Sequence, residues 1–166
     1  KNKNLIFINF AAIRDEQLFI NSSIKHLKSI IDNNIFSSLE ILKILIPEMI
    51  NHRFGRIIFI SSSTSEKGSV GNLGYSTSKS SLLGLSNTLA KEYSLFNITS
   101  NIISLGYFES KMWFSLKNKV KKKLLEETLI KKLGNTDVIY NTIKLISKNR
   151  FINMSKINLD GGNLKK

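Results

Sequence analysis

Strand-like and helix-like segments alternate along the whole chain, and this alternation constrains the fold more than any other feature. Residues 5–10 are almost entirely apolar, as expected for a parallel strand buried on both faces. Residues 57–60, 98–103 and 156–159 follow as further strands. The segments between them carry apolar residues at helical spacing. The pattern predicts an α/β fold, a single domain with a parallel sheet and helices on both faces.

The segments expected to be helical have recognisable starts and breaks. Ser22 or Ser23 can cap a helix whose apolar stripe continues to Asn51, and Pro47 should kink or loosen its last turn. Thr136 can cap a last helix that runs to about Lys148. A further helix is expected at 75–96, with loops at 64–74 and 106–116.

Composition excludes several classes of protein. The chain has 166 residues and no cysteine, which excludes disulfides and thiolate metal sites. No apolar run approaches the length of a membrane-spanning helix, and no spacing suggests a metal site. The net charge of +13 raises a nucleic-acid hypothesis, which rests on charge alone. The densest lysine cluster is 117–123, with Lys131 and Lys132 beyond it. Between them Leu124, Leu125, Leu129 and Ile130 recur at helical spacing, so we expect the lysines to form the solvated side of an amphipathic helix.

Tyr75 and Lys79 carry a phenol and an ammonium group four residues apart, a spacing that brings two side chains to one face of a helix. Ser62 lies thirteen residues upstream, where a strand passes into a loop. A hydroxyl at a strand end, beside a helix with Tyr and Lys, suits proton transfer to or from a carbonyl or alcohol. Asn34, further upstream, belongs to the same constellation.

These residues and several motifs resemble the short-chain dehydrogenase/reductase family, and within it the 3-oxoacyl-acyl-carrier-protein reductase-like group. Asp32-Asn33-Asn34 resembles the family's D-x-N segment, and residues 55–62 (GRIIFISS) resemble its GRIVxISS strand. Residues 101–106 stand where the family has N-x-x-x-P-G, and Asp160-Gly161-Gly162 matches its closing DGG. The motifs follow in order along nearly the whole chain.

The resemblance implies a Rossmann-like sheet and assigns four catalytic roles. Tyr75 is the expected general acid/base, and Lys79 lowers its pKa and binds the nicotinamide ribose. Ser62 donates a hydrogen bond to the carbonyl oxygen as negative charge develops there. Asn34 holds a water that links Lys79 to solvent.

The implied cofactor is NAD(P), with NADP favoured. Residues 9–12 align with the family's NNAG strand, with Phe10 in place of the second Asn and Ala12 in place of the Gly. Leu105 replaces the Pro of PG. The cofactor contacts carried over by resemblance are Phe10, Ala11, Ala12, Tyr75, Lys79, Gly106, Phe108 and Ser110.

The family's opening strand, TGxxxGxG turn and helix match nothing in these residues. We therefore interpret 1–166 as a partial domain, the C-terminal two-thirds of a family member, without the cofactor-binding βαβ segment. In the family's strand order the strand at 5–10 is central, whereas here it would be an edge with an uncovered apolar face.

The sequence thus predicts a cytoplasmic, homo-oligomeric oxidoreductase. It would transfer hydride between NAD(P)H and a carbonyl or alcohol, and the expected substrate is a 3-oxoacyl thioester on a small molecule or an acyl carrier. Arg53 fits a carrier-protein contact, whereas Phe96 stands where a second basic residue is common. The alternatives are a sugar or polyol dehydrogenase, and a catalytically incompetent remnant retained for assembly. Neither nucleic acid nor membrane is an expected partner.

Overall fold

The computed structural model describes residues 4–163, with the side chains at 111 and 112 excepted. Four parallel strands in this range form one sheet in the order β1-β2-β3-β4. The strands are β1 (Leu5–Asn9), β2 (Gly55–Ser62), β3 (Ile98–Leu105) and β4 (Lys156–Leu159). Their order follows the chain, so β1 and β4 are the two edges.

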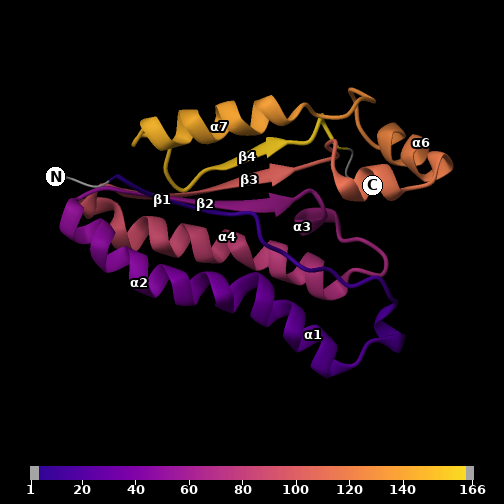
Figure 1. Cartoon of the computed structure of the whole chain (residues 1–166), viewed down its shortest axis with the longest axis horizontal. Helices are drawn as coiled ribbons and strands as arrows, with labels where there is room; N and C mark the ends of the chain where they lie inside the picture. The colour runs from indigo at the N-terminus through magenta and orange to yellow at the C-terminus, as the bar shows by residue number, and fades with distance from the viewer. Residues whose placement is uncertain (1–3, 164–166) are drawn as a thin grey trace.

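The helices form a layer on each face of this sheet (Figure 1). One layer contains α1 (Ile24–Ile31), a π-helical turn (Asp32–Phe36), α2 (Ser37–His52) and α4 (Leu73–Tyr93). The other is α7 (Thr136–Lys148). The short helices α3 (Thr64–Lys67), α5 (Lys111–Ser115) and α6 (Asn118–Glu126) belong to connections that follow β2 and β3. Single 3₁₀ turns occupy Phe19–Asn21 and Ser94–Phe96.

The core consists of two clusters, one on each side of the sheet, because successive strand residues point to opposite faces. Ile57 and Phe59 of β2 pack with α2 and α4, against residues such as Met49 and Leu82. Ile58, on the alternate face, packs with a second cluster that contains Ile146 of α7 and Ile60 and Ile103. Burying each such side chain stabilises the fold by roughly 1.5–3 kcal/mol.

β1 differs from the central strands in its exposure. Leu5 and Phe7 pack on the helix layer, and the Phe7 ring meets Phe59 edge-on at 6.1 Å between centroids. Ile6 and Ile8, which point to the opposite face, are 45% and 36% exposed. The expected fold class is therefore confirmed, and so is the expectation that this strand forms an edge with an uncovered apolar face.

Two local expectations were wrong. The expected loop at 64–74 begins with the short helix α3. Leu129 and Ile130 lie beyond the end of α6, where their backbone N–H groups donate to the carbonyls of Gly162 and Gly161, and their side chains are exposed and do not form the apolar face of a helix. Pro47 lies inside α2, five residues before its end at His52, and its expected effect on the last turn stays a prediction. The residues before α2 depart from α-geometry in the π-helical turn that contains Asn34.

Candidate active site

The end of β2 and the first turns of α4 bring Ser62, Tyr75 and Lys79 to one place. Ser62 is the last residue of β2, and Tyr75 and Lys79 lie in the first two turns of α4. The start of α4 is held by Asp15, a buried residue from the connection that follows β1. Its carboxylate accepts hydrogen bonds from the backbone N–H of Gly74 (2.8 Å) and of Tyr75 (3.1 Å). Asp15 thus satisfies two of the donors that a helix start leaves free and fixes where Tyr75 begins.

Tyr75 is partly buried, and its environment acts on its pKa in two directions. Burial raises the pKa, while interaction with the Ser62 side chain and the positive charge of Arg14 lower it. The rise prevails. A protonated phenol is therefore the resting form at neutral pH, as a proton donor requires.

Ser62 keeps its own proton available. Its Oγ accepts hydrogen bonds from the backbone N–H of Thr64 (3.3 Å) and from Thr64 Oγ1 (3.1 Å). A hydroxyl that accepts two hydrogen bonds still has its hydrogen to donate. Ser62 is thus poised to donate toward an oxygen placed between it and Tyr75.

Lys79 is buried, with 4% of its surface exposed. Its Nζ donates to the backbone carbonyl of Ile60 at 2.7 Å and lies 5.7 Å from the centre of the Tyr75 ring. Burial lowers its pKa to about 8, so the ammonium form still predominates at neutral pH. One carbonyl uses one of its three hydrogens, and the others remain for a bound ligand. Its expected effect on the pKa of Tyr75 stays a prediction.

Asn34 is buried in the π-helical turn and bonds to two other segments. Its Oδ1 accepts from Ile13 N and its Nδ2 donates to Ile13 O, both at 2.8 Å. Nδ2 also donates to Ser78 Oγ at 2.9 Å. The side chain thus joins the connection after β1 to the residue next to Lys79. The expected water relay from Asn34 to Lys79 stays a prediction.

The two ends of the expected cofactor site differ. Near β1, Phe10, Ala11 and Ala12 are exposed, and the Ala11 N–H donates to Asn9 Oδ1 at 2.9 Å. Phe10, the residue after the end of β1, is 55% exposed.

After β3, the expected cofactor contacts Gly106, Phe108 and Ser110 lie against other parts of the protein. A Cβ on Gly106 would come within 2.6 Å of Asp160 Cα, so the close approach that requires glycine here is to the DGG turn. The Phe108 ring similarly occupies the space where a Cβ on Gly134 would lie. Ser110 caps α5, its Oγ accepting from Trp113 N at 3.1 Å.

These residues fit one half of a nicotinamide dinucleotide. The spare hydrogens of Lys79 and the hydroxyls of Tyr75 and Ser62 suit a ribose and a reacting carbonyl. For the pyrophosphate and adenine, residues 4–163 contain no turn that resembles TGxxxGxG, and the residues expected on that side lie at the exposed strand end at Phe10. The fit is therefore to the reacting end of the cofactor.

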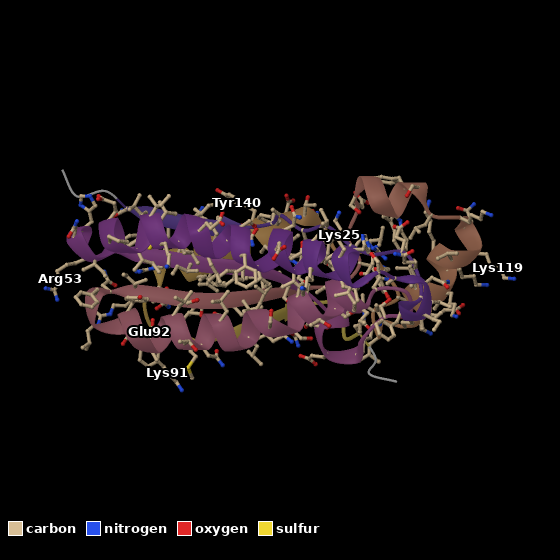
Figure 2. The ribbon with its side chains drawn as sticks, turned by 90° about the horizontal axis from the view of Figure 1, so that it is seen from below. Lys25, Arg53, Lys91, Glu92, Lys119 and Tyr140 are labelled. Carbon is tan, nitrogen blue, oxygen red and sulfur yellow. The ribbon has the colours of Figure 1, made fainter. Side chains whose placement is uncertain are left out.

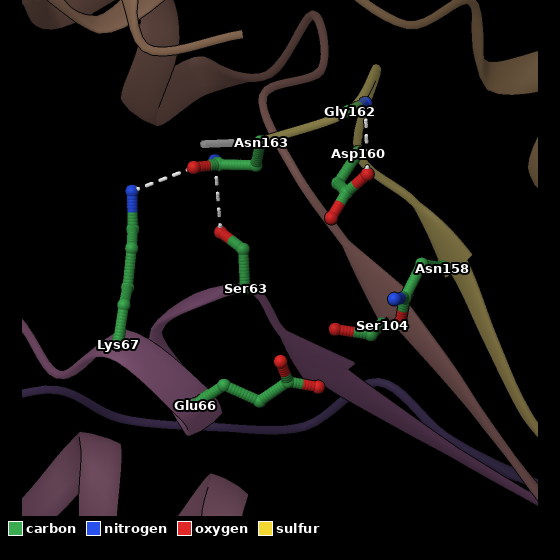
Figure 3. A pocket seen from close by; sticks show the side chains of 8 residues that line it. All are labelled: Ser63, Glu66, Lys67, Ser104, Asn158, Asp160, Gly162 and Asn163. Carbon is green, nitrogen blue, oxygen red and sulfur yellow. Dashed lines mark hydrogen bonds between the residues drawn. The ribbon is translucent and has the colours of Figure 1, made fainter. Parts of the chain in front are cut away.

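A polar cavity of about 170 Å³ lies beside this site, at the carboxyl ends of β2, β3 and β4 (Figure 3). Lys67 Nζ donates to Asn163 Oδ1 (2.8 Å) and to Glu127 Oε2 (2.9 Å), and Tyr107 OH donates to the same Glu127 oxygen (3.0 Å). Burial first, and then Glu127, raise the pKa of Tyr107 to about 12. This network ties α3 to the aromatic loop, where the Tyr107 and Trp113 rings lie 6.2 Å apart.

Sequence reasoning missed Arg14, Asp15 and Asn72, which meet at the start of α4. Arg14 Nε donates to Asn72 Oδ1 at 3.1 Å, and the Arg14 guanidinium lies 6.0 Å from the Tyr75 ring centre. Asn72 and Asp15 are buried polar residues. No local signal reveals such pairs, because their members are about sixty positions apart in the sequence.

Two wider features bear on the kind of protein. No group of three or more His, Asp or Glu residues within the described range could hold a metal ion. None of the helices that the structure describes combines the length and apolar character needed to cross a bilayer.

Comparison with known proteins identifies the family. The short chain dehydrogenase family model matches residues 5–121, so the chain belongs to the short-chain dehydrogenase/reductase family.

Curated relatives include the 3-oxoacyl-[acyl-carrier-protein] reductases of Buchnera aphidicola subsp. Schizaphis graminum and of Aquifex aeolicus. They are 33% and 28% identical over 159 residues, which is 95% of this chain. The chain spans 65% and 64% of their respective lengths.

Solved structures agree on the fold but name other substrates. A protein of Agrobacterium tumefaciens assigned as a gluconate dehydrogenase superposes with a TM-score of 0.91 at 25% identity, covering 97% of this chain and 65% of the other. Another from the same organism, assigned as a 2-deoxy-D-gluconate 3-dehydrogenase and solved with bound NADP, has a TM-score of 0.90 at 22% identity. It covers 97% of this chain and 68% of the other, and shows the fold alone.

Proposed function

We propose that this chain carries the catalytic part of an NAD(P)-dependent oxidoreductase that acts on a 3-oxoacyl thioester. The observation that carries the proposal is the meeting of Ser62, Tyr75 and Lys79 at the carboxyl end of β2. A bound nicotinamide supplies the hydride. Ser62 donates a hydrogen bond to the substrate oxygen, which draws charge onto that oxygen. Tyr75 gives the oxygen its proton, and Lys79 stabilises the phenolate that remains.

The choice of a thioester rests on the curated relatives and on charge. Both relatives described above are 3-oxoacyl-carrier-protein reductases. α6, which carries Lys119, Lys122 and Lys123 on its exposed surface, lies at the carboxyl-end side of the sheet (Figure 1). A cationic helix there would attract an acidic carrier. Arg53, the other expected carrier contact, lies after the end of α2, at the opposite end of the molecule from Lys119 (Figure 2).

The direct test compares turnover and cofactor binding in the full product of the gene and in residues 1–166. We expect the gene product to oxidise NADPH with acetoacetyl-coenzyme A, a simple 3-oxoacyl thioester. Tyr75→Phe should lower turnover by about 10²–10⁴-fold while NADPH affinity, measured by calorimetry, stays nearly unchanged. Tyr140→Phe, on the exposed face of α7, is the matched control. Normal turnover by Tyr75→Phe would refute the catalytic role.

Residues 1–166 alone should bind NADPH weakly and turn over nothing. Positioning of the hydride donor accounts for a large part of such a barrier, and residues 4–163 hold only the reacting end. Micromolar NADPH binding by the short chain would contradict this.

A sugar or polyol dehydrogenase is the second candidate, supported by the gluconate dehydrogenase neighbour. The same assay with D-gluconate and NAD or NADP separates the two. Reduction of acetoacetyl-coenzyme A without gluconate oxidation supports the first. A gene product inactive on both substrates that still assembles would favour the assembly role.

We also propose that α2 and α4 pair with a second copy of the protein. They lie side by side on one face of the sheet (Figure 2). Ile44 of α2 and Leu83 of α4 are exposed, and a Cβ on Gly84 would meet open space. Light scattering at micromolar concentration should find an oligomer for the gene product. Ile44→Asp with Leu83→Asp should reduce its mass, and a monomeric parent would refute the proposal.

A further inference from the structure

The connection after β1 holds a second cation beside the candidate catalytic phenol. Arg14 lies in this connection, and its guanidinium carbon is 6.0 Å from the centre of the Tyr75 ring. The Lys79 nitrogen, from α4, lies 5.7 Å from the same centre. Tyr75 is therefore approached by two positive charges from two different segments.

Arg14 is held in this place by its own contacts. Nε donates to Oδ1 of Asn72, which is buried at the start of α4. The Glu16 carboxylate lies 4.0 Å from Nε. The side chain of Arg14 is 40% exposed and that of Glu16 79% exposed, so the acid is largely solvated and neutralises the guanidinium only in part.

The backbone around Arg14 is fastened on both sides. Ile13, the preceding residue, exchanges two hydrogen bonds with Asn34. Asp15, the following residue, binds the N–H groups of Gly74 and Tyr75. Gln17 N donates to Gly71 O at 3.1 Å. Three attachments within five residues make the position of Arg14 a fixed property of the fold.

We propose that Arg14 is a positioning residue for Tyr75, a second cation that stabilises its phenolate form and so sets the pH at which the phenol exchanges its proton. The inference rests on the proposed function for its catalytic meaning, but the electrostatic effect is a property of these residues alone. Among the described residues, Arg14 and Lys79 lie at the Tyr75 ring, the Ser62 side chain interacts with its phenol, and Asp15 lies at its backbone N–H. The Asp15 carboxylate accepts hydrogen bonds from the backbone N–H groups of Gly74 and Tyr75. The positive charge of Arg14 lowers the pKa of Tyr75, in agreement with the geometry.

The test measures the titration of Tyr75 itself. Residues 1–166 are prepared with ¹³Cζ-labelled tyrosine, and the Tyr75 signal is assigned by its loss in Tyr75→Phe. Arg14→Gln should raise the midpoint by about 0.5 pH unit or more. Arg14→Lys, which keeps the charge, should restore most of the wild-type value. Lys91→Gln, which removes an exposed charge from the other end of α4 (Figure 2), should leave the midpoint in place.

An unchanged midpoint in Arg14→Gln, or an equal rise in Lys91→Gln, would overturn the proposal. If Arg14→Gln does not fold, Glu16→Gln decides the question. Removing this exposed carboxylate leaves the guanidinium less neutralised, so the Tyr75 midpoint should fall. An unchanged or higher midpoint there would overturn the proposal as well.

The same variant connects the titration to catalysis. In the full gene product, Arg14→Gln should move the acid limb of the kcat/KM profile for alcohol oxidation upward by the same number of pH units. A shifted NMR midpoint in residues 1–166, together with a full gene product that has no activity, would uphold the role of Arg14 and refute the proposed function. An unshifted midpoint in an active enzyme would do the reverse.

Discussion

β1 and β2 are paired residue by residue in one sheet, yet their side chains lie in very different surroundings. Seven of the eight residues of β2 are buried, whereas β1 is buried only at Asn9. Ile8 is the register partner of Ile58; Ile58 is fully buried and Ile8 is 36% exposed. The difference lies in what covers the second face, since α7 packs over Ile58 but leaves β1 open.

The candidate site follows this difference. Its catalytic side chains extend from the buried centre, from β2 and from α4 packed against it. The residues expected near the adenine end, Phe10 to Ala12, extend from the open edge. The proposed reaction site therefore lies in the buried centre, and the edge strand leaves one apolar face and its outer backbone groups uncovered.

The register pair offers the sharpest test and the largest expected effect. Ile58→Ala should cost about 2–5 kcal/mol of the free energy of unfolding, because it leaves a cavity between two layers. Ile8→Ala removes the same atoms from a half-open site and should cost under about 1 kcal/mol. Urea denaturation of residues 1–166 measures both. Equal costs would mean that β1 is covered in solution.

The pH dependence of stability at Lys79 tests whether water is excluded from its side-chain nitrogen in the folded protein. Burial lowers the pKa of Lys79 to about 8, against about 10.4 in an unfolded chain. Between about pH 8 and about pH 10.4 the unfolded state binds more protons at Lys79 than the folded state does. The contribution of Lys79 to the free energy of unfolding therefore rises with pH over this range. From pH 7 to pH 10.5 the wild type should gain up to about 3 kcal/mol relative to Lys79→Met.

The control for this comparison is Lys91→Met, at an exposed position of the same helix. Its difference from the wild type should stay constant over the same pH range. A flat difference for Lys79→Met as well would show that water reaches the Lys79 nitrogen in solution.

Lysine substitutions on β1 test whether its exposed apolar face causes aggregation. Ile6→Lys with Ile8→Lys should change the free energy of unfolding of residues 1–166 by less than about 1 kcal/mol and should reduce aggregation, because lysine on an edge strand discourages pairing with another chain. Light scattering at a fixed concentration measures this. Val70→Lys with Leu95→Lys, two exposed apolar positions away from the edge, adds the same charge. Equal improvement by both pairs would attribute the effect to net charge alone.

The smallest expected effect concerns the network beside the site. Burial alone would raise the pKa of Glu127, but hydrogen bonds from Lys67 and Tyr107 and the charge of Lys67 hold it below its usual value. Its contribution is therefore present above about pH 4.3 and is lost as the pH falls through the lower folded value.

Glu127→Gln should accordingly cost under about 1 kcal/mol at pH 7 and nothing at pH 2, by thermal or urea unfolding. Glu126→Gln, at the exposed neighbouring position, is the control. A cost that persists at pH 2 would indicate packing and not charge.

The sequence by itself determined the strands, their parallel order and the spacing of the candidate catalytic residues. These depend on local geometry: four residues bring Tyr75 and Lys79 to one helix face, and an apolar run that ends at Ser62 places its hydroxyl at a strand end. The exposed edge at β1 was also predictable, because residues 1–166 contain no segment that resembles the strands that precede this one in the family.

Only the tertiary structure decided what surrounds those residues. Burial of Lys79, the placement of Arg14 and Asp15 at Tyr75, and the contacts of Gly106 and Gly134 depend on segments that are distant in sequence. The effect of a charge on the pKa of a phenol depends on the distance between the two groups and on how far water screens them. Both quantities depend on contacts between segments that are distant in sequence, so they are set only when the chain folds.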